Sequence, residues 1–205
     1  NWIIQYRKIQ TGGGFPGYSR IYFIDQNTGF TKSVTGFDKT VNGGNNWTSL
    51  FSGETFQDMS VINTNNIWLA SGEPFTGGVF RTTNGGANWV QQYFTGSNHP
   101  VKIYMYNSDT GFIASGNYVR KTTNGGVNWS LVVSGEGFTD MHFVNSLTGY
   151  RSYSNTMKKT TDGGLNWVSQ PMPQGGQIIT SSLTKFSLIN KDTIWGVGGQ
   201  IFYGG

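Results

Sequence analysis

The chain has 205 residues and a net charge of +4, and only 12% of its residues are charged. It contains no cysteine, which excludes thiol catalysis, thiolate metal sites and disulfides. Two histidines, His99 and His142, are too few to favour a histidine metal site, so we expect no metal ion and no other cofactor. The 14 basic residues are scattered, which does not favour nucleic acid binding, and no apolar run is long enough to span a membrane.

Glycine is the commonest residue, with 31 copies, and aromatic residues make up 15% of the chain. These residue types are typical of tight turns and β-strands. No segment keeps an amphipathic helical period for three turns. The composition therefore predicts an all-β fold.

Two sequence elements repeat along the chain. The first, Ile/Val/Tyr-Asn/Asp followed by a polar turn and an aromatic residue, recurs five times and ends at Phe30, Trp68, Phe112, Tyr150 and Trp195. The second, Thr-x-Asn/Asp-Gly-Gly-x-Asn-Trp, recurs four times and ends at Trp47, Trp89, Trp129 and Trp167. These tryptophans are 42, 40 and 38 residues apart, a period typical of a four-stranded β-propeller blade.

Each repeat unit is predicted to form four strands. In the third unit these strands cover residues 101–106, 111–115, 118–122 and 128–133. The Asn-Gly-Gly between the last two strands indicates a hairpin, since glycine and asparagine accept positive φ and an Asx side chain can cap the turn. We expect the tryptophan after the turn to lie in the blade core and the aromatic residue of the other element to fill the gap between blades.

The units are arranged in one expected domain, residues 1–205, with blades at about 18–52, 56–94, 100–134, 138–170 and 181–205. Residues 1–8 match a fourth strand, and the last unit lacks one. The prediction is a five-bladed propeller closed by the N-terminal strand. A five-repeat slice of a longer ring gives the same count, and that alternative stays open.

The second repeat element resembles the Asp-box, or BNR repeat, and the two elements together are similar to the photosystem II assembly and stability factor family. Similar repeats occur in secreted bacterial proteins that carry a type IX sorting domain. Asn42, Asn84 and Asn124 stand where the Asp-box has aspartate, and Asp162 keeps it. The resemblance implies a β-propeller. It implies little about function, because Asp-boxes occur in both enzymes and receptors.

The first strand of each blade lines the central channel of a propeller, and its side chains alternate between two faces. One face is apolar in all five copies and should pack into the blades. The other face should point into the channel, where it supplies the ligand-binding candidates Arg20, Tyr22, Asp58, Lys102, Tyr104, Asp140, His142 and Lys185. These charges either pair around the axis as a plug or form a binding site for a charged or hydroxylated ligand.

The loops provide a second candidate surface. Phe15 and Tyr18 lie in a glycine-rich segment before the first blade, and Phe75 lies in an insertion of the second blade. Aromatic residues on flexible loops are typical of binding loops, although the same rings can pack over the propeller rim.

No catalytic constellation is evident in these positions. Asp58 and Asp140 belong to alternate blades, and no glutamate falls in the channel columns, whereas glycosidases need paired carboxylates. We therefore predict a non-catalytic scaffold that engages a protein or a glycan, with a carbohydrate-active propeller (lectin-like, or part of a glycoside hydrolase or sialidase) as the alternative. The composition and the type IX similarity favour a bacterial extracellular or cell-surface location, with a leader that is not present in this chain. The oligomeric state stays open.

Deleting residues 1–8 tests the predicted closure. The truncated chain should expose unpaired sheet edges and aggregate. Size-exclusion chromatography measures this, and a truncated chain that stays monomeric and equally stable contradicts the closure.

Overall fold

The computed structural model of the chain describes residues 20–33, 36–72, 77–93, 100–171, 183–190 and 192–198. These residues form five antiparallel sheets, and none of them is helical, so the described part holds no candidate membrane-spanning helix. The first sheet contains β1 (Arg20–Phe23), β2 (Gly29–Ser33), β3 (Gly36–Thr40) and β4 (Thr48–Ser52). The second contains β5 (Phe56–Val61), β6 (Ile67–Ser71), β7 (Gly78–Thr82) and β8 (Val90–Tyr93).

The remaining sheets follow the same order. The third contains β9 (Lys102–Met105), β10 (Gly111–Ser115), β11 (Tyr118–Thr122) and β12 (Ser130–Ser134). The fourth contains β13 (Asp140–Phe143), β14 (Gly149–Tyr153), β15 (Thr156–Thr160) and β16 (Val168–Gln170). The fifth pairs β17 (Leu183–Leu188) with β18 (Ile194–Gly198).

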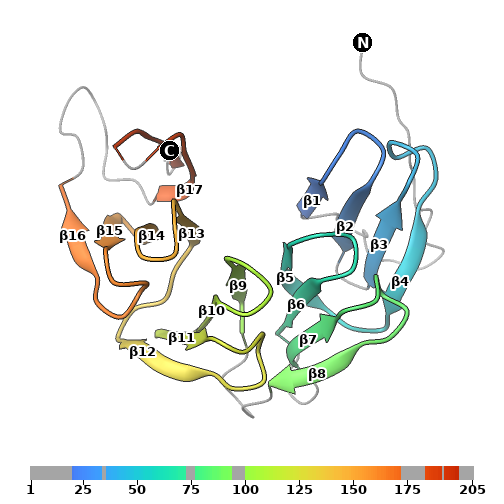
Figure 1. Cartoon of the computed structure of the whole chain (residues 1–205), viewed down its shortest axis with the longest axis horizontal. Helices are drawn as coiled ribbons and strands as arrows, with labels where there is room; N and C mark the ends of the chain where they lie inside the picture. Colours follow the sequence, from blue (N-terminus) through green and yellow to red (C-terminus); the bar gives the residue numbers. More distant parts are fainter. Residues whose placement is uncertain are drawn as a thin grey trace, which may run out of the picture.

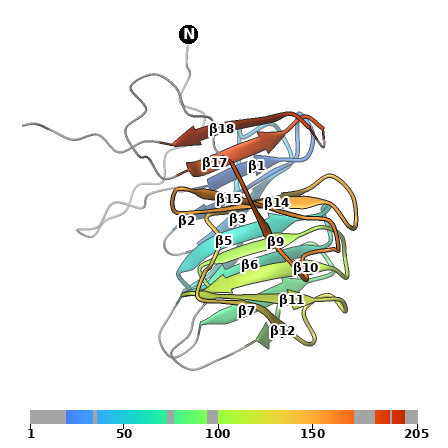
Figure 2. The same cartoon turned by 90° about the vertical axis from the view of Figure 1, so that its left-hand side faces the viewer.

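The sheets stand side by side around an arc, with the first strand of each sheet on the inside (Figure 1). In side view the strands of all the sheets are roughly aligned with the axis of that arc (Figure 2). This is the predicted all-β propeller of four-stranded blades, and five sheets agree with the predicted blade count. The predicted closing strand, residues 1–8, lies outside the described residues.

The hydrophobic core lies between neighbouring sheets rather than inside any one of them. The second strand of each of the first three sheets is buried along its whole length, and in β6 successive side chains face the sheets on either side. In β6, Ile67 and Leu69 pack against the first sheet, whereas Trp68 packs with Ile103 and Met105 of the third. The buried apolar area that stabilises each sheet is therefore shared with its neighbours.

The aromatic residue of the first repeat element fills the gap between sheets, as predicted. Phe30, Trp68, Phe112 and Tyr150 are all buried. The Trp68 indole also donates a hydrogen bond to the Gly125 carbonyl of the next sheet, at 2.9 Å. The fifth copy, Trp195, is 69% exposed, because no described strand packs beyond β18.

The Thr-x-Asn/Asp-Gly-Gly turns have the predicted hairpin geometry. In the third sheet, Gly125 and Gly126 have φ of 70° and 100°. The Thr122 hydroxyl accepts a bond from Gly126 N–H at 2.8 Å, and the Asn124 side chain accepts one from Asn128 N–H at 2.9 Å. The same bonds recur in the other three turns, so each repeat fixes its own hairpin by local side-chain capping.

The tryptophan after the turn differs from the prediction. Trp89 was expected in the core of its own blade, but its ring packs edge-on against Phe37 and Phe51 of the preceding sheet. Its indole N–H donates to the Leu50 carbonyl at 3.2 Å, also in the preceding sheet. The turn places this side chain on the flank of the blade, so the tryptophan joins two sheets while staying half-exposed.

Replacing Trp89 with alanine tests this role. The change removes two ring contacts and one hydrogen bond at the junction of two sheets, so we expect a loss of about 2–4 kcal/mol in the free energy of unfolding. Val90→Ala, at the exposed neighbouring position, is the matched control and should cost less than about 0.5 kcal/mol. Urea denaturation measures both, and equal effects would contradict the interface assignment.

Candidate functional site

The innermost strands direct polar side chains to the axis of the arc and apolar side chains into the sheet interfaces. Met59, Ile103, Met141 and Phe186 of the apolar column are buried, as predicted. Ile21 of the same column is 60% exposed, because no described strand packs against the outer flank of β1. The alternation of apolar and polar side chains predicted from the sequence therefore holds along the arc. Only Ile21, the first residue of the apolar column, lacks a described neighbouring sheet.

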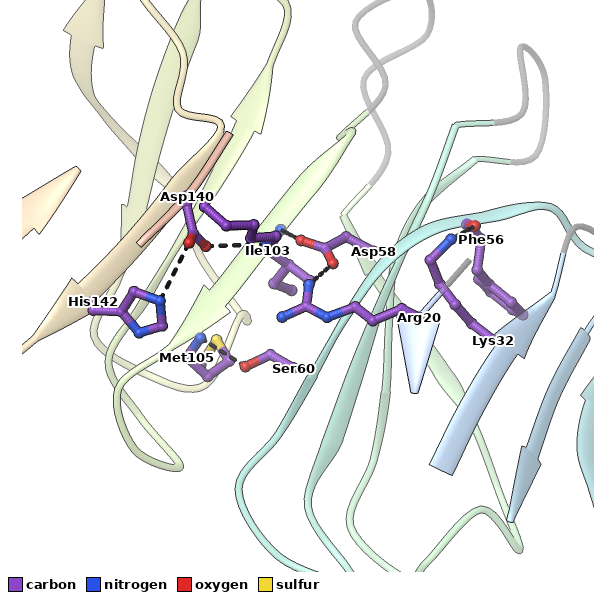
Figure 3. Close-up of polar contacts among 10 residues, drawn as sticks. Arg20, Lys32, Phe56, Asp58, Ser60, Ile103, Met105, Asp140 and His142 are labelled. Atoms are coloured by element: carbon purple, nitrogen blue, oxygen red, sulfur yellow. Dashed lines mark hydrogen bonds and ion pairs between the residues drawn. The ribbon is translucent and has the colours of Figure 1, made fainter. Parts of the chain in front are cut away.

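Asp58 and Asp140 connect adjacent inner strands. The Asp58 carboxylate pairs with Arg20 of the first sheet and accepts a hydrogen bond from Ile103 N–H of the third at 3.1 Å (Figure 3). The Asp140 carboxylate lies 3.2 Å from Lys185 Nζ and accepts a bond from Phe186 N–H at 3.0 Å. Each carboxylate thus satisfies a strand-edge amide and a cation of neighbouring sheets.

Further along the same strands, two hydroxyl groups also accept hydrogen bonds from the backbone amides of the next inner strand. Ser60 Oγ accepts a hydrogen bond from Met105 N–H at 2.9 Å, and Tyr104 Oη accepts one from Phe143 N–H at 3.0 Å. Ser60 stands in the same channel-facing column of the sequence as Tyr104, although it is not among the predicted ligand-binding residues. The polar face of the inner strands is therefore structural first, since it binds the sheets to one another.

Lys32 is a charged residue near the axis that was not among the predicted site residues. It lies on β2, directly opposite Arg20, where the corresponding positions of the next two sheets are Ala70 and Ala114. Its side chain is buried, and its ammonium donates to the Phe56 carbonyl at 2.8 Å (Figure 3). A lysine in a column of small residues is the sequence signal that identifies it.

Three basic groups near the axis have lowered pKa values, chiefly because they are buried. Burial, reinforced by the charges of Lys102 and Arg20, lowers the pKa of Lys32 to about 8. Burial, together with Lys185 and Arg20, also lowers the pKa of Lys102, and burial lowers that of Arg20. Among the described residues, Lys102 has no ion-pair partner, so the Arg20–Asp58 and Asp140–Lys185 pairs leave positive charge unbalanced.

Asp140 is held in its ionised form. Burial by itself would raise its pKa, but hydrogen bonds from His142 and Phe186 N–H and the charge of Lys185 outweigh burial and lower the pKa to about 2. His142 Nε2 lies 3.4 Å from Asp140 Oδ2, and the His142 ring packs edge-on against Phe186. Asp140 is consequently a poor proton donor near neutral pH.

These inner strands border a cavity of about 300 Å³ on the axis, lined by residues of β1, β5, β9 and β13 and by Phe138 and Thr139, which precede β13. Six of the eight predicted channel residues line it: Arg20, Tyr22, Asp58, Tyr104, Asp140 and His142. Lys102 and Lys185 do not line it, although Lys102 lies on the same strand as Tyr104. The structure thus brings most of the predicted channel set together around one hollow.

The remaining candidates lie elsewhere. Phe15, Tyr18 and Phe75, predicted as loop-binding residues, fall outside the described residues. Arg151 is buried on β14, where its Nη2 lies 2.7 Å from Glu136 Oε2, and it does not line the cavity. No group of three or more potential metal ligands occurs in the described part of the chain.

No protein-family model and no curated protein matches the chain. Among solved structures, it is similar to the GH74 enzyme of Niastella koreensis (20% identity, 91% of this chain and 33% of that chain, TM-score 0.71). It is also similar to the WD40 β-propeller domain of Doa1 (11% identity, 90% and 62%, TM-score 0.58). YCF48 bound to D1 peptide matches at 14% identity over 87% and 89% of the chains, with a TM-score of 0.46. At these identities the likeness extends to the propeller fold alone.

Asp140→Asn tests the connection between sheets through its pH dependence. A lowered folded-state pKa adds stability that is complete above about pH 5 and is lost as the pH falls from about 4 towards 2. We expect the variant to be less stable than wild type by about 1–3 kcal/mol at pH 7, and this difference to shrink on acidification.

Urea denaturation at pH 7, 4, 3 and 2 measures this difference. Asp109→Asn, at an exposed carboxylate in the turn after β9, is the matched control and should follow wild type throughout. A difference between Asp140→Asn and wild type that stays constant from pH 7 to pH 2 contradicts the assigned role.

Proposed function

We propose that this chain is a non-catalytic binding scaffold that receives part of a protein or glycan partner in the axial cavity. The observation that carries the proposal is the use of the two axial carboxylates. Both serve as connections between sheets, while a cavity of about 300 Å³ beside them is lined by Arg20, Tyr22 and His142. A concave site with a few converging polar groups is the usual form of a ligand site.

The same observation argues against a glycosidase among the described residues. Such enzymes use one carboxyl group as a general acid and a second as nucleophile or base. Asp58 is paired with Arg20 and Ile103 N–H, and the pKa of Asp140 is lowered to about 2. Asp140 is therefore not poised to donate a proton near pH 7, and Asp58 is engaged by two partners. The carbohydrate-active alternative is therefore retained in its lectin-like form, as glycan binding.

We further infer that the turns are Asp-box repeats serving as structural hairpins, and that the propeller is displayed outside the cell or on its surface. The first inference is supported by the capping bonds around Thr122 and Asn124, which recur in four turns. The second rests on composition: a chain without cysteine, rich in glycine, with few charges.

Binding to arrays of glycans and of peptides tests the scaffold. We expect wild-type protein to bind a subset of one array, and the double variant Tyr22→Ala/His142→Ala to bind at least tenfold more weakly. Both side chains line the cavity and are partly exposed. Because His142 also packs against Phe186 of the fifth sheet, the unfolding midpoint of the variant separates lost binding from lost structure.

The matched control is Val127→Ser/Leu165→Ser, which alters two exposed residues in the hairpin turns, outside the cavity lining. Binding that survives the cavity variant unchanged, or is lost equally in the control, contradicts the cavity as the site. Silence of wild type on both arrays contradicts the proposed function itself.

A further inference from the structure

Three of the four repeated hairpin turns contain an Asn-Gly pair, a sequence prone to spontaneous deamidation. The pairs are Asn42-Gly43, Asn84-Gly85 and Asn124-Gly125. In this reaction the backbone nitrogen of the glycine attacks Cγ of the asparagine, which forms a cyclic imide and expels ammonia. Water then opens the imide to aspartate or isoaspartate. Glycine favours the attack because it has no side chain to obstruct it.

The folded turn engages the attacking nitrogen. Gly125 N–H donates a hydrogen bond to the Asp109 carbonyl at 2.8 Å. The first glycines of the other two turns make the same bond, to the carbonyls of Asn27 and Asn65, at 2.9 and 3.2 Å. In each case the acceptor lies in the turn between the first and second strands of the same sheet. The nitrogen has to lose its proton to attack, so it reacts only after this bond has broken.

The side chain that would be attacked is held as well. Asn124 Oδ1 accepts hydrogen bonds from the Thr122 hydroxyl at 3.0 Å and from Asn128 N–H at 2.9 Å. The side chains of Asn42 and Asn84 accept the same two bonds in their own turns. Ring closure requires the side chain to rotate freely over the nitrogen of its own glycine, and both bonds resist that rotation.

The fourth turn shows which reaction product the hairpin accepts. Asp162 stands where the other turns have asparagine, and its Oδ1 accepts from the Thr160 hydroxyl at 2.7 Å and from Asn166 N–H at 3.0 Å. An aspartate is therefore compatible with the capped turn. An isoaspartate is not, because it lengthens the main chain by one carbon and shortens the side chain by one, and the cap depends on both.

We propose that Asn42, Asn84 and Asn124 are deamidation sites that the folded hairpins keep inert and that react when a turn opens. Both repeat elements contribute to this protection, since one supplies the acceptor for the glycine amide and the other holds the asparagine. Each reaction consumes one water and releases one ammonia, and it requires no enzyme, metal or oxidant. The inference concerns the hairpins and is independent of the axial cavity.

Peptide mapping by mass spectrometry tests the protection. The full chain is incubated at pH 8 with and without guanidinium chloride, and deamidation is followed at each of the three sites. We expect rates at least about tenfold lower in the folded chain, because only the opened fraction of turns reacts. Equal rates in the two conditions overturn the proposal. Faster reaction in the folded chain also overturns it, since the bonds to the side chain would then activate it.

Thr122→Val tests whether each turn protects its own asparagine. The change removes the hydroxyl that donates to Asn124 and accepts from Gly126 N–H, so deamidation of Asn124 in the folded chain should rise several-fold. Asn84 in the same molecules is the internal control and should keep its wild-type rate. Thr123→Val, at the exposed neighbouring position, is the matched control and should leave both rates unchanged. Rates that rise equally at both sites, or at neither, overturn protection by the individual turn.

Thermal unfolding compares the two products. Asn124→Asp should melt within about 2 °C of wild type, because Asp162 makes the same bonds in its own turn. Chains that carry isoaspartate at this position, separated by chromatography after incubation in denaturant and then refolded, should melt several degrees lower. An isoaspartate fraction that melts with wild type, or an Asn124→Asp variant that melts as low as that fraction, overturns the distinction between the products.

Discussion

The unpaired amides of the innermost strands are the constraint on which the axis of this propeller depends. Each inner strand is the edge of its sheet, and its outward N–H groups need acceptors that no neighbouring backbone supplies. The preceding sheet provides them as side chains: Asp58 and Ser60 for β9, Tyr104 for β13 and Asp140 for β17. The polar residues of the axis therefore act first as acceptors for backbone amides. A ligand at the axis can bind only to the hydrogen-bonding groups that these contacts do not use.

The hydrogen-bonding groups that remain determine what the cavity can bind. Acceptor atoms are consumed by amides and cations, whereas the hydroxyl hydrogens of Ser60 and Tyr104 and part of the Arg20 guanidinium remain. The buried Lys32 ammonium donates a hydrogen bond to the Phe56 carbonyl of the next sheet. A structural requirement of the fold thus commits the carboxylates to neighbouring strands and leaves hydroxyl donors in the cavity lining.

Away from the axis, aromatic side chains keep neighbouring sheets in contact. Buried aromatic residues such as Trp68 and half-exposed ones such as Trp89 join neighbouring sheets from opposite sides of a blade. The hairpins that carry Trp89 are fixed by local capping, so the position of each joining residue is set within its own repeat.

The sequence by itself determined the strand-rich composition, the repeat period, the hairpin turns and the alternation of the inner strands, because these are local properties that recur in each unit. In the third sheet it placed β10 and β11 at their observed bounds and erred by one or two residues at β9 and β12. It also predicted six of the residues that line the cavity. Only the tertiary structure decided that Trp89 joins two sheets, that Lys32 reaches the axis region and that Asp58 and Asp140 are committed to neighbouring strands. Those facts depend on how one sheet rotates against the next, and no repeat unit contains that relation within its own sequence.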